Sequence, residues 1–333
     1  MTTTPQTNTD LREIAGILRD RDNFVICGHV SPDGDCIGSQ LALWYVLRAI
    51  GKTATCILVK DEGIPGTLDF LPGSCEMVPA CRFNGPADVF VGVDVPTRER
   101  IGEDACAILD ACTTSITVDH HACATTMCEF VYVDPDSASA SILIWELAKM
   151  LVGTPTADCA MCAYTGLITD TGGFRFQNTD PRAFAVASDL VAHGVDPSHA
   201  ATCAFQSRSM ASLRLEELAI KRMKLASEGR VAISWVTLSD LDQFGASKSD
   251  AEPIIDVLRS LSGIRVACML REQDGVIRGN LRSKDTTDVS VLAIELGGGG
   301  HKAAAGFTLD TDLETAITLL EQKLCALVEE RAE

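Results

Sequence analysis

The stretch Asn23-Phe-Val-Ile-Cys-Gly-His29-Val-Ser-Pro-Asp33-Gly-Asp35-Cys-Ile-Gly38 decides the fold of this chain. Its apolar part, residues 24–27, predicts a buried strand, and the apolar positions after Asp35 predict an amphipathic helix to about residue 51. Proline and glycine prevent either element from extending through the loop. One imidazole and two carboxylates therefore lie on a strand-to-helix turn, where a parallel sheet presents its ligands. Taken alone, the same acids suit a helix N-cap and a turn equally well.

Two further apolar runs end in side chains of the same kind. Residues 88–94 end at Asp94, and residues 115–121 end in Asp119-His120-His121, which is the profile of buried parallel strands. A strand is also predicted at 54–59, and helices are predicted at about 11–19, 138–151 and 156–168, the last of which leads to Asp170. Strands that alternate with helices predict an α/β fold with a doubly wound parallel sheet.

Six side chains that can bind metals follow these strand and helix ends: His29, Asp33, Asp35, Asp94, His120 and Asp170. Because the carboxyl ends of parallel strands share one edge, we expect these side chains to converge. Oxygen ligands with a few imidazoles and no thiolate favour Mn²⁺, Mg²⁺ or Co²⁺ over Zn²⁺ or copper. Six ligands exceed the needs of one ion, so we expect two ions that share a carboxylate, as in enzymes that direct in-line attack at phosphorus.

A change of pattern divides the chain into residues 1–205, a linker helix at 206–228 and a smaller mixed α/β domain at 229–333. Strands are predicted at 231–236, 264–270 and 276–281 of the smaller domain. Its polar groups gather in Asn280-Leu-Arg282-Ser283-Lys284 and in the glycine run 297–300, which precedes His301. Glycines let backbone N–H groups approach an oxyanion, although a bare glycine run is more often a flexible loop.

The charge balance restricts the partners of the protein. With 28 Lys and Arg against 46 Asp and Glu in 333 residues, the chain has no broad basic surface for long duplex nucleic acid, whereas a small anionic ligand remains compatible. The 14 cysteines lie mostly in apolar segments and are interpreted as reduced core thiols, with Cys159-Ala-Met-Cys162 as a weak zinc or redox alternative. The N-terminus lacks a signal-peptide pattern and no apolar run reaches ~18 residues, so we expect a cytoplasmic protein without a membrane anchor.

The ordered set His29-x-x-x-Asp33-x-Asp35, Asp94, Asp119-His120-His121 and Asp170-Thr-Gly resembles the DHH phosphoesterases, and Gly297-Gly-Gly-Gly-His301 resembles the DHHA1 domain that accompanies them. The resemblance spans about residues 15–310. It implies that His29, Asp33 and Asp94 hold one metal ion, and that Asp94 bridges to a second ion held with Asp35, His120 and Asp170.

The resemblance also implies roles for the neighbouring residues. His121 would face the substrate phosphate as an electrostatic stabiliser or a proton donor, Asp94 would act with it in catalysis, and Asp119 would orient an imidazole. Substrate contacts would come from Arg282, Ser283, Gly299, Gly300 and His301. No side-chain nucleophile is required, so no covalent phospho-enzyme is expected.

Within this family, the compact two-domain architecture resembles the oligoribonuclease and pAp phosphatase branch. The implied substrates are short 5′-phosphorylated oligoribonucleotides, pApA and pAp, and the implied cofactor is a pair of Mn²⁺ ions, with Mg²⁺ or Co²⁺ as substitutes. A soluble cyclic di-AMP or pApA phosphodiesterase, a single-strand DNA exonuclease and an inactive nucleotide sensor are the alternatives. The oligomeric state stays open, with a homodimer as a form that family members often take.

Overall fold

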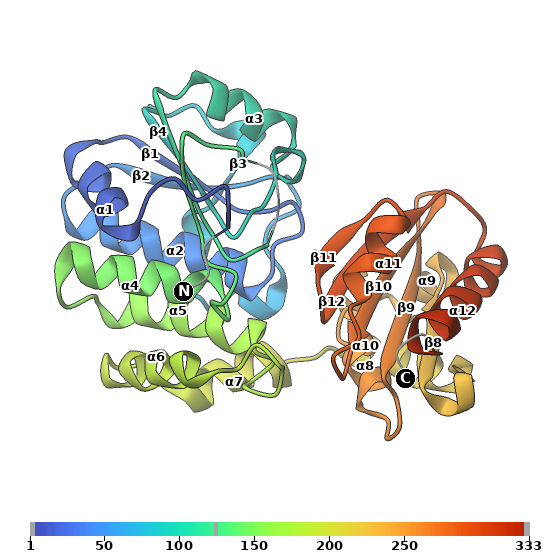
Figure 1. The fold of residues 1–333 in the computed structure, drawn as a ribbon. Helices are drawn as coiled ribbons and strands as arrows, with labels where there is room; N and C mark the ends of the chain where they lie inside the picture. Colours follow the sequence, from blue (N-terminus) through green and yellow to red (C-terminus); the bar gives the residue numbers. More distant parts are fainter. Residues whose placement is uncertain (1–3, 123–125, 330–333) are drawn as a thin grey trace. The chain divides into compact units, whose positions relative to one another are not determined.

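The computed structural model describes residues 4–122 and 126–329, and it divides the chain into two compact units, Met1–Ser207 and Arg208–Glu333 (Figure 1). Each unit has its own sheet and its own buried core, so each is described by itself. None of the helices in the described ranges has the length and apolar character needed to cross a bilayer. Every cysteine in these ranges is a free thiol.

The first unit is built on a parallel sheet that has the order β3-β2-β1-β4-β5-β6 among the described residues. The strands are β1 (Phe24–Cys27), β2 (Ala54–Leu58), β3 (Val78–Pro79), β4 (Val89–Val93), β5 (Thr114–Asp119) and β6 (Phe130–Val133). All neighbouring pairs run parallel. The chain builds outward from β1 in one direction and then returns to place β4 on its other side, so the order reverses between β1 and β4. Ligands in open α/β sheets bind at such a reversal, beyond the carboxyl ends of the strands.

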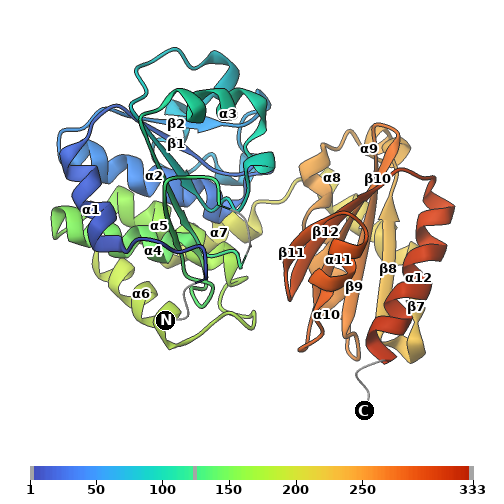
Figure 2. The same ribbon diagram turned by 45° about the horizontal axis from the view of Figure 1, so that its top comes forward.

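Helices cover both faces of this sheet unequally. Helices α1 (Leu11–Asp20), α2 (Gly34–Ala49), α4 (Ala140–Val152), α5 (Ala157–Asp170), α6 (Pro181–Ala192) and α7 (Pro197–Gln206) contribute to the larger core. Helix α3 (Gly102–Ala111) packs on the opposite face, as both views show (Figures 1 and 2). The predicted doubly wound α/β sheet is therefore confirmed, although sequence reasoning did not identify α3 or β6.

The second unit is a mixed sheet with the order β11-β12-β10-β9-β8-β7. Its strands are β7 (Lys224–Ala226), β8 (Val231–Val236), β9 (Val266–Gln273), β10 (Val276–Ser283), β11 (Gly299–His301) and β12 (Ala304–Leu309). Among the described strands of this second unit, only β8 and β9 pair in parallel. Helices α8 (Met210–Arg222) and α10 (Ile254–Ser260) pack on one face, and α11 (Val289–Glu295) and α12 (Leu313–Glu329) pack on the other.

The expected linker helix differs from the structure. Helix α8 ends at Arg222, and residues 224–226 form strand β7, which pairs antiparallel with β8. Helix α8 also belongs to the second unit, because Leu215 and Ala219 lie in a buried cluster with residues of β8 and α10. The short helices α9 (Leu238–Phe244) and α11 were not predicted.

Candidate metal centre and phosphate-binding face

The predicted ligands meet at the reversal of the first sheet. His29 lies two residues beyond β1, and Asp94 and His120 directly follow β4 and β5. Asp35 lies in the first turn of α2, and Asp170 is the last residue of α5. The structure thus brings side chains from five elements to one edge of the sheet, as the strand-end argument predicted.

His120 is the most crowded of these ligands. Its Nδ1 lies 3.2 Å from the carbonyl oxygen of Ser137, which can only accept, so Nδ1 carries a proton. Its Nε2 lies 3.4 Å from Asp94 Oδ1, 3.5 Å from Asp170 Oδ2 and 3.8 Å from Asp35 Oδ2. An imidazole lone pair among three carboxylates is unfavourable unless a proton or a cation neutralises the cluster. Burial opposes the charged imidazole, but contact with Asp94 and the charge of Asp170 raise the pKa of His120 well above its usual value.

Asp94 lies between the two sides of this cluster: His29 is on one side, and His120 with Asp35 and Asp170 is on the other. Its φ of 51° lies in the left-handed region, which a non-glycine residue adopts at a cost, and this turn directs the side chain back across the sheet edge. Asp94 Oδ2 lies 3.4 Å from His29 Nε2, while Oδ1 faces His120. Burial alone would raise the pKa of Asp94, but contacts with His120 and His29 hold it well below the usual range. Asp94 is therefore an anion that faces two imidazoles.

The other two carboxylates of the cluster, Asp35 and Asp170, lose their protons less readily than an exposed acid does. Burial and the charge of Asp94 raise the pKa of Asp35 to about 7, although Asp35 accepts hydrogen bonds from Ala140 N (2.6 Å) and Ser141 N (2.9 Å) in the first turn of α4. Burial likewise raises the pKa of Asp170 well above its usual value. A divalent cation would stabilise both as anions, so this donor set fits hard cations.

Close contact between two helices fixes the distance between Asp35 and Asp170. A Cβ on Gly38 of α2 would lie 2.4 Å from the carbonyl oxygen of Cys162 on α5. A Cβ on Gly166 of α5 would lie 2.6 Å from Asp35 Oδ1. Because both positions are glycine, the backbones of α2 and α5 approach closely enough for the acids on the two helices to reach the same imidazole.

Asp33 and the second histidine lie at the border of the cluster. Asp33 Oδ1 caps α2 by accepting from Asp35 N and Cys36 N, both at 3.1 Å, and Oδ2 lies 3.9 Å from His29 Nε2. Both interpretations of this acid, cap and ligand, are therefore compatible with its position. His121 Nδ1 lies 2.7 Å from Asp119 Oδ1, which also accepts from His120 N at 2.8 Å. Asp119 thus orients the backbone of one histidine and the ring of the other.

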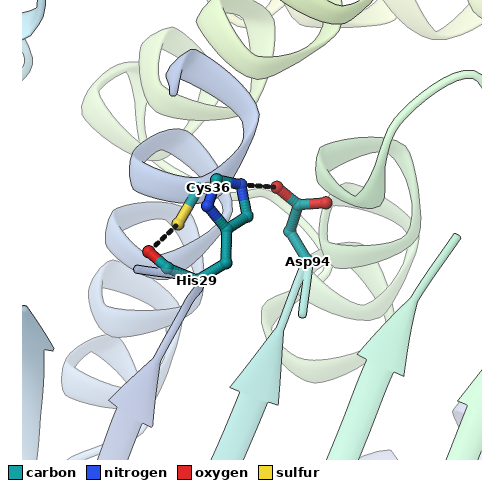
Figure 3. A group of neighbouring side chains, drawn as sticks. All are labelled: His29, Cys36 and Asp94. Atoms are coloured by element: carbon teal, nitrogen blue, oxygen red, sulfur yellow. Dashed lines mark hydrogen bonds and ion pairs between the residues drawn. The ribbon is translucent and has the colours of Figure 1, made fainter. Parts of the chain in front are cut away.

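Cys36 is a member of this cluster that sequence reasoning missed. Its sulfur, a ring nitrogen of His29 and a carboxylate oxygen of Asp94 all lie within 4.8 Å of one another (Figure 3). The predicted ligand set contained no thiol, so the structure adds Cys36 as a further candidate ligand on the His29 side. The sequence feature that could have identified Cys36 is its position directly after Asp35 in the motif.

The second unit carries a row of basic side chains on one face of its sheet. Arg278, Asn280 and Arg282 alternate along β10, and the register with β9 places Arg271 opposite Arg278. Arg271 Nη2 donates to Asn280 Oδ1 at 2.8 Å. Burial lowers the pKa of Arg271; Glu252 opposes this effect, and Arg278 and Arg282 lower it further. Guanidinium groups that repel one another in this way form a face suited to a phosphate.

We define the arginine face as Arg271, Arg278, Asn280 and Arg282. The polar stretch singled out from the sequence included Asn280 and Arg282, with Arg282 as the predicted contact, and it missed Arg271 and Arg278. The period-two pattern of β10 could have indicated Arg278 as well, because it lies two residues before Asn280. Ser283, the other predicted contact on this strand, has its side chain on the opposite, buried face, where Oγ donates to the carbonyl oxygen of Asp285 at 2.8 Å. That orientation argues against Ser283 as a substrate contact.

The glycine run 297–300 caps helix α11 with its first two residues and begins strand β11 with its last two. The amides of Gly297 and Gly298 donate to Ile294 O (3.0 Å) and Ala293 O (2.7 Å) and so cap α11. Gly299 and Gly300 form strand β11 against β12, and pairing through Gly306 aligns Gly299 with Asn280. Gly299 therefore borders the arginine face. For His301, the structure describes only the backbone, which pairs with Ala304.

Comparisons with known proteins identify both units of the chain, the first with the metal centre and the second with the arginine face. A family model described as the DHH family, N-terminal domain, matches residues 23–167, and a DHHA1 domain model matches residues 228–329. The chain is 30% identical over 309 residues to a bifunctional oligoribonuclease and PAP phosphatase of Thermus thermophilus, covering 92% of this chain and 90% of that protein. It is 26% identical over 292 residues to the protein of the same name in Bacillus subtilis, covering 86% and 90%.

One further relative and one solved structure are also similar to this chain. A cyclic-di-AMP phosphodiesterase of Geobacillus thermodenitrificans is 24% identical over 321 residues, covering 90% of this chain and 46% of that protein. Among solved structures, an exopolyphosphatase-related protein of Bacteroides fragilis superposes with a TM-score of 0.88 at 28% identity, covering 96% of this chain and 97% of that one.

Proposed function

The chain belongs to the DHH family of phosphoesterases with a DHHA1 domain, and from this premise we propose that it hydrolyses short 5′-phosphorylated oligoribonucleotides to mononucleotides and pAp to AMP. Membership makes it a hydrolase of phosphoric esters. The observation that carries the proposal is the convergence of Asp94, His29, His120, Asp35 and Asp170 at one edge of the sheet.

Divalent metal ions are the cofactors that this donor set supports. We propose two ions that share Asp94: His29 and Asp33 would bind one of them, and Asp35, His120 and Asp170 would bind the other. Mn²⁺ is the proposed preferred ion, because the ligands are mainly carboxylates and imidazoles. When bound, such a pair lowers the pKa of a water and neutralises the charge that develops on the phosphoryl oxygens.

The residues of the chain then act by positioning. Asp119 holds a proton on His121 Nδ1 and thereby fixes the orientation of the imidazole that would face the phosphate or the leaving oxygen. A polar groove lined by Ser137, Asn178 and Arg182 adjoins this centre, because Ser137 O contacts His120 and Asn178 Nδ2 donates to Asp170 O at 3.0 Å. This groove is the proposed path for the scissile end of the substrate.

The arginine face supports the choice of substrate. Arg278 and Arg282 would bind a phosphate of a short substrate. Gly299 aligns with Asn280 across Gly306 of β12, and it has no side chain to obstruct a nucleotide on this part of the sheet. With 28 Lys and Arg against 46 Asp and Glu, the chain has too little basic surface to follow a long strand, and the likeness to the two oligoribonucleases favours the same size class.

The test is a substrate panel with Mn²⁺: pAp, pApA, a linear 5-mer, a 24-mer and cyclic di-AMP. We expect fast release of mononucleotide from pAp, pApA and the 5-mer, and loss of this activity in Asp94→Ala. Asp158→Ala is the matched control, because Asp158 is an exposed acid at the start of α5. Equal activity of wild type and Asp94→Ala contradicts the proposal.

The same panel separates the other candidates. The likeness to the cyclic-di-AMP phosphodiesterase makes hydrolysis of cyclic di-AMP the second candidate, and it predicts that this substrate is cleaved as fast as pApA. A DNA exonuclease would act undiminished on single strands longer than ten nucleotides. An inactive sensor would bind pAp without releasing phosphate.

A further inference from the structure

The two sides of the metal centre differ in their ligand chemistry. On one side, Asp35, His120 and Asp170 offer oxygen and nitrogen ligands within 4.8 Å of one another. On the other side, His29 and Asp94 are joined by the thiol of Cys36 within the same distance. The two sides should therefore differ in the metal ion that they prefer.

The local fold directs the Cys36 thiol toward this site. Cys36 is the third residue of α2, it is fully buried, and its Sγ lies 3.9 Å from the carbonyl oxygen of His29. A Cβ on Gly28 would lie only 2.2 Å from that sulfur. Glycine at position 28 thus leaves the space that the thiol occupies against the end of β1.

His29 supplies an independent sign of a missing ligand. Its side chain is only 7% exposed, and Nδ1 has no hydrogen-bond partner among residues 4–122 and 126–329. In Figure 3 the other ring nitrogen points to Asp94, whereas this nitrogen lies on the Cys36 side of the ring. A buried imidazole nitrogen is rarely left unpaired, because the cost of desolvation is then not offset.

We propose that Cys36 is a metal ligand and that, with His29 and Asp94, it selects a thiophilic cation such as Zn²⁺, Co²⁺ or Cd²⁺ for this side of the centre. The inference rests on the metal centre of the proposed function and refines its choice of ion. Cys, His and Asp are the side chains that bind Zn²⁺ in proteins, and thiolate ligands favour softer ions than an all-oxygen set does. The Asp35 side retains its preference for a hard ion such as Mn²⁺.

Metal binding by Cys36 would release the proton of its thiol. The Cys36 thiol gives its proton to solvent as the metal–sulfur bond forms, so one proton is released per ion bound at this position. Three protein ligands leave a fourth position for water or substrate, as in catalytic zinc sites. Because His29 Nε2 faces Asp94 and Nδ1 lies on the Cys36 side, the ring must turn before one nitrogen can share an ion with both other side chains. Metal–sulfur bonds of ~2.3 Å and metal–nitrogen bonds of ~2.0–2.1 Å also require the three side chains to close around the ion.

The experiment uses the full chain, stripped by a chelator and titrated with Co²⁺ without oxygen. Cobalt reports its ligands spectroscopically: d–d bands in the visible show that it is bound, and a sulfur-to-cobalt charge-transfer band in the near ultraviolet shows a thiolate ligand. We expect both bands in the wild type and only the d–d bands in Cys36→Ser and Cys36→Ala. We also expect both variants to bind Zn²⁺ at least about tenfold more weakly while Mn²⁺ binding changes less than about twofold.

Cys203→Ser is the matched control, since Cys203 is the thiol whose Sγ lies 3.8 Å from His199 Nδ1 on α7, outside the centre. It should retain the charge-transfer band. A wild-type protein with d–d bands and no charge-transfer band, or a band that survives in Cys36→Ser, overturns the role of Cys36 and leaves the proposed function intact. Absence of all cobalt bands overturns both.

Discussion

Replacement of Gly38 by alanine should separate the two helices that carry Asp35 and Asp170. The added Cβ would lie 2.4 Å from the carbonyl oxygen of Cys162, whereas ordinary contacts begin at 3.4 Å. The obstacle is backbone on α5, which cannot rotate aside, so α2 and α5 must move apart by up to 1.0 Å, the difference between these distances.

The expected cost follows from this displacement. Overpacking by one methyl group costs about 1–3 kcal/mol. For a unit of this size that corresponds to a fall in melting temperature of about 2–12 °C. A displacement of ~1 Å in a catalytic constellation can lower the rate about 100-fold, so we expect a matching loss of Mn²⁺-dependent pApA hydrolysis.

Gly16→Ala is the matched control, because Gly16 lies inside helix α1 and nothing lies within 4 Å of its added Cβ. It should gain about 0.5–1 kcal/mol from helix propensity and retain full activity. Thermal unfolding followed by circular dichroism, with the hydrolysis assay alongside, measures both variants. A Gly38→Ala protein as stable and active as the wild type would refute the close packing of α2 and α5.

Three further perturbations test other parts of the centre. Asp119→Asn removes the charge that orients His121 and should lower kcat about 10- to 100-fold without abolishing Mn²⁺ binding, measured by steady-state kinetics and metal titration. Arg282→Ala should raise KM for pApA about tenfold or more with little change in kcat, whereas Arg214→Ala, an exposed arginine of α8, should change neither. The metal-free protein should lose stability as the pH rises from 5 to 8. The pKa of Asp35 rises on folding from its ordinary value of 3.8 to about 7, and the pKa of His120 is raised as well, so the folded chain keeps protons that the unfolded chain has released. Chemical unfolding across this range checks the sign, and a stability that rises with pH would contradict it; Mn²⁺ affinity should rise over the same range as protons compete less.

The local parts of the centre were predictable from sequence. The apolar run before His29, the loop glycine and proline, and the helix after Asp35 are each encoded within a few residues, so periodicity identified them. Alternation of strands and helices then placed the acids at one sheet edge, because the topology of parallel sheets leaves few alternatives.

The parts that sequence reasoning missed depend on three-dimensional geometry that periodicity does not encode. The position of Cys36 beside His29 depends on how α2 leaves β1, and the left-handed φ of Asp94 has no signature in its neighbours. The pairing of Arg271 with Arg278 is set by the register of two strands, which a one-residue slip would abolish. The linker helix was predicted too long because residues 224–226 pair with β8, a tertiary contact that overrides helical periodicity.

The most direct test of the account is anomalous diffraction at the manganese edge from crystals of the full chain, soaked with Mn²⁺ as the only divalent ion and at a concentration that fills both sides of the centre. We predict two peaks on either side of Asp94, ~3.5–4 Å apart, one next to His29 and the other among Asp35, His120 and Asp170. A single peak away from Asp94, or none at this edge of the sheet, would contradict the claim that these side chains assemble a two-ion phosphoesterase centre.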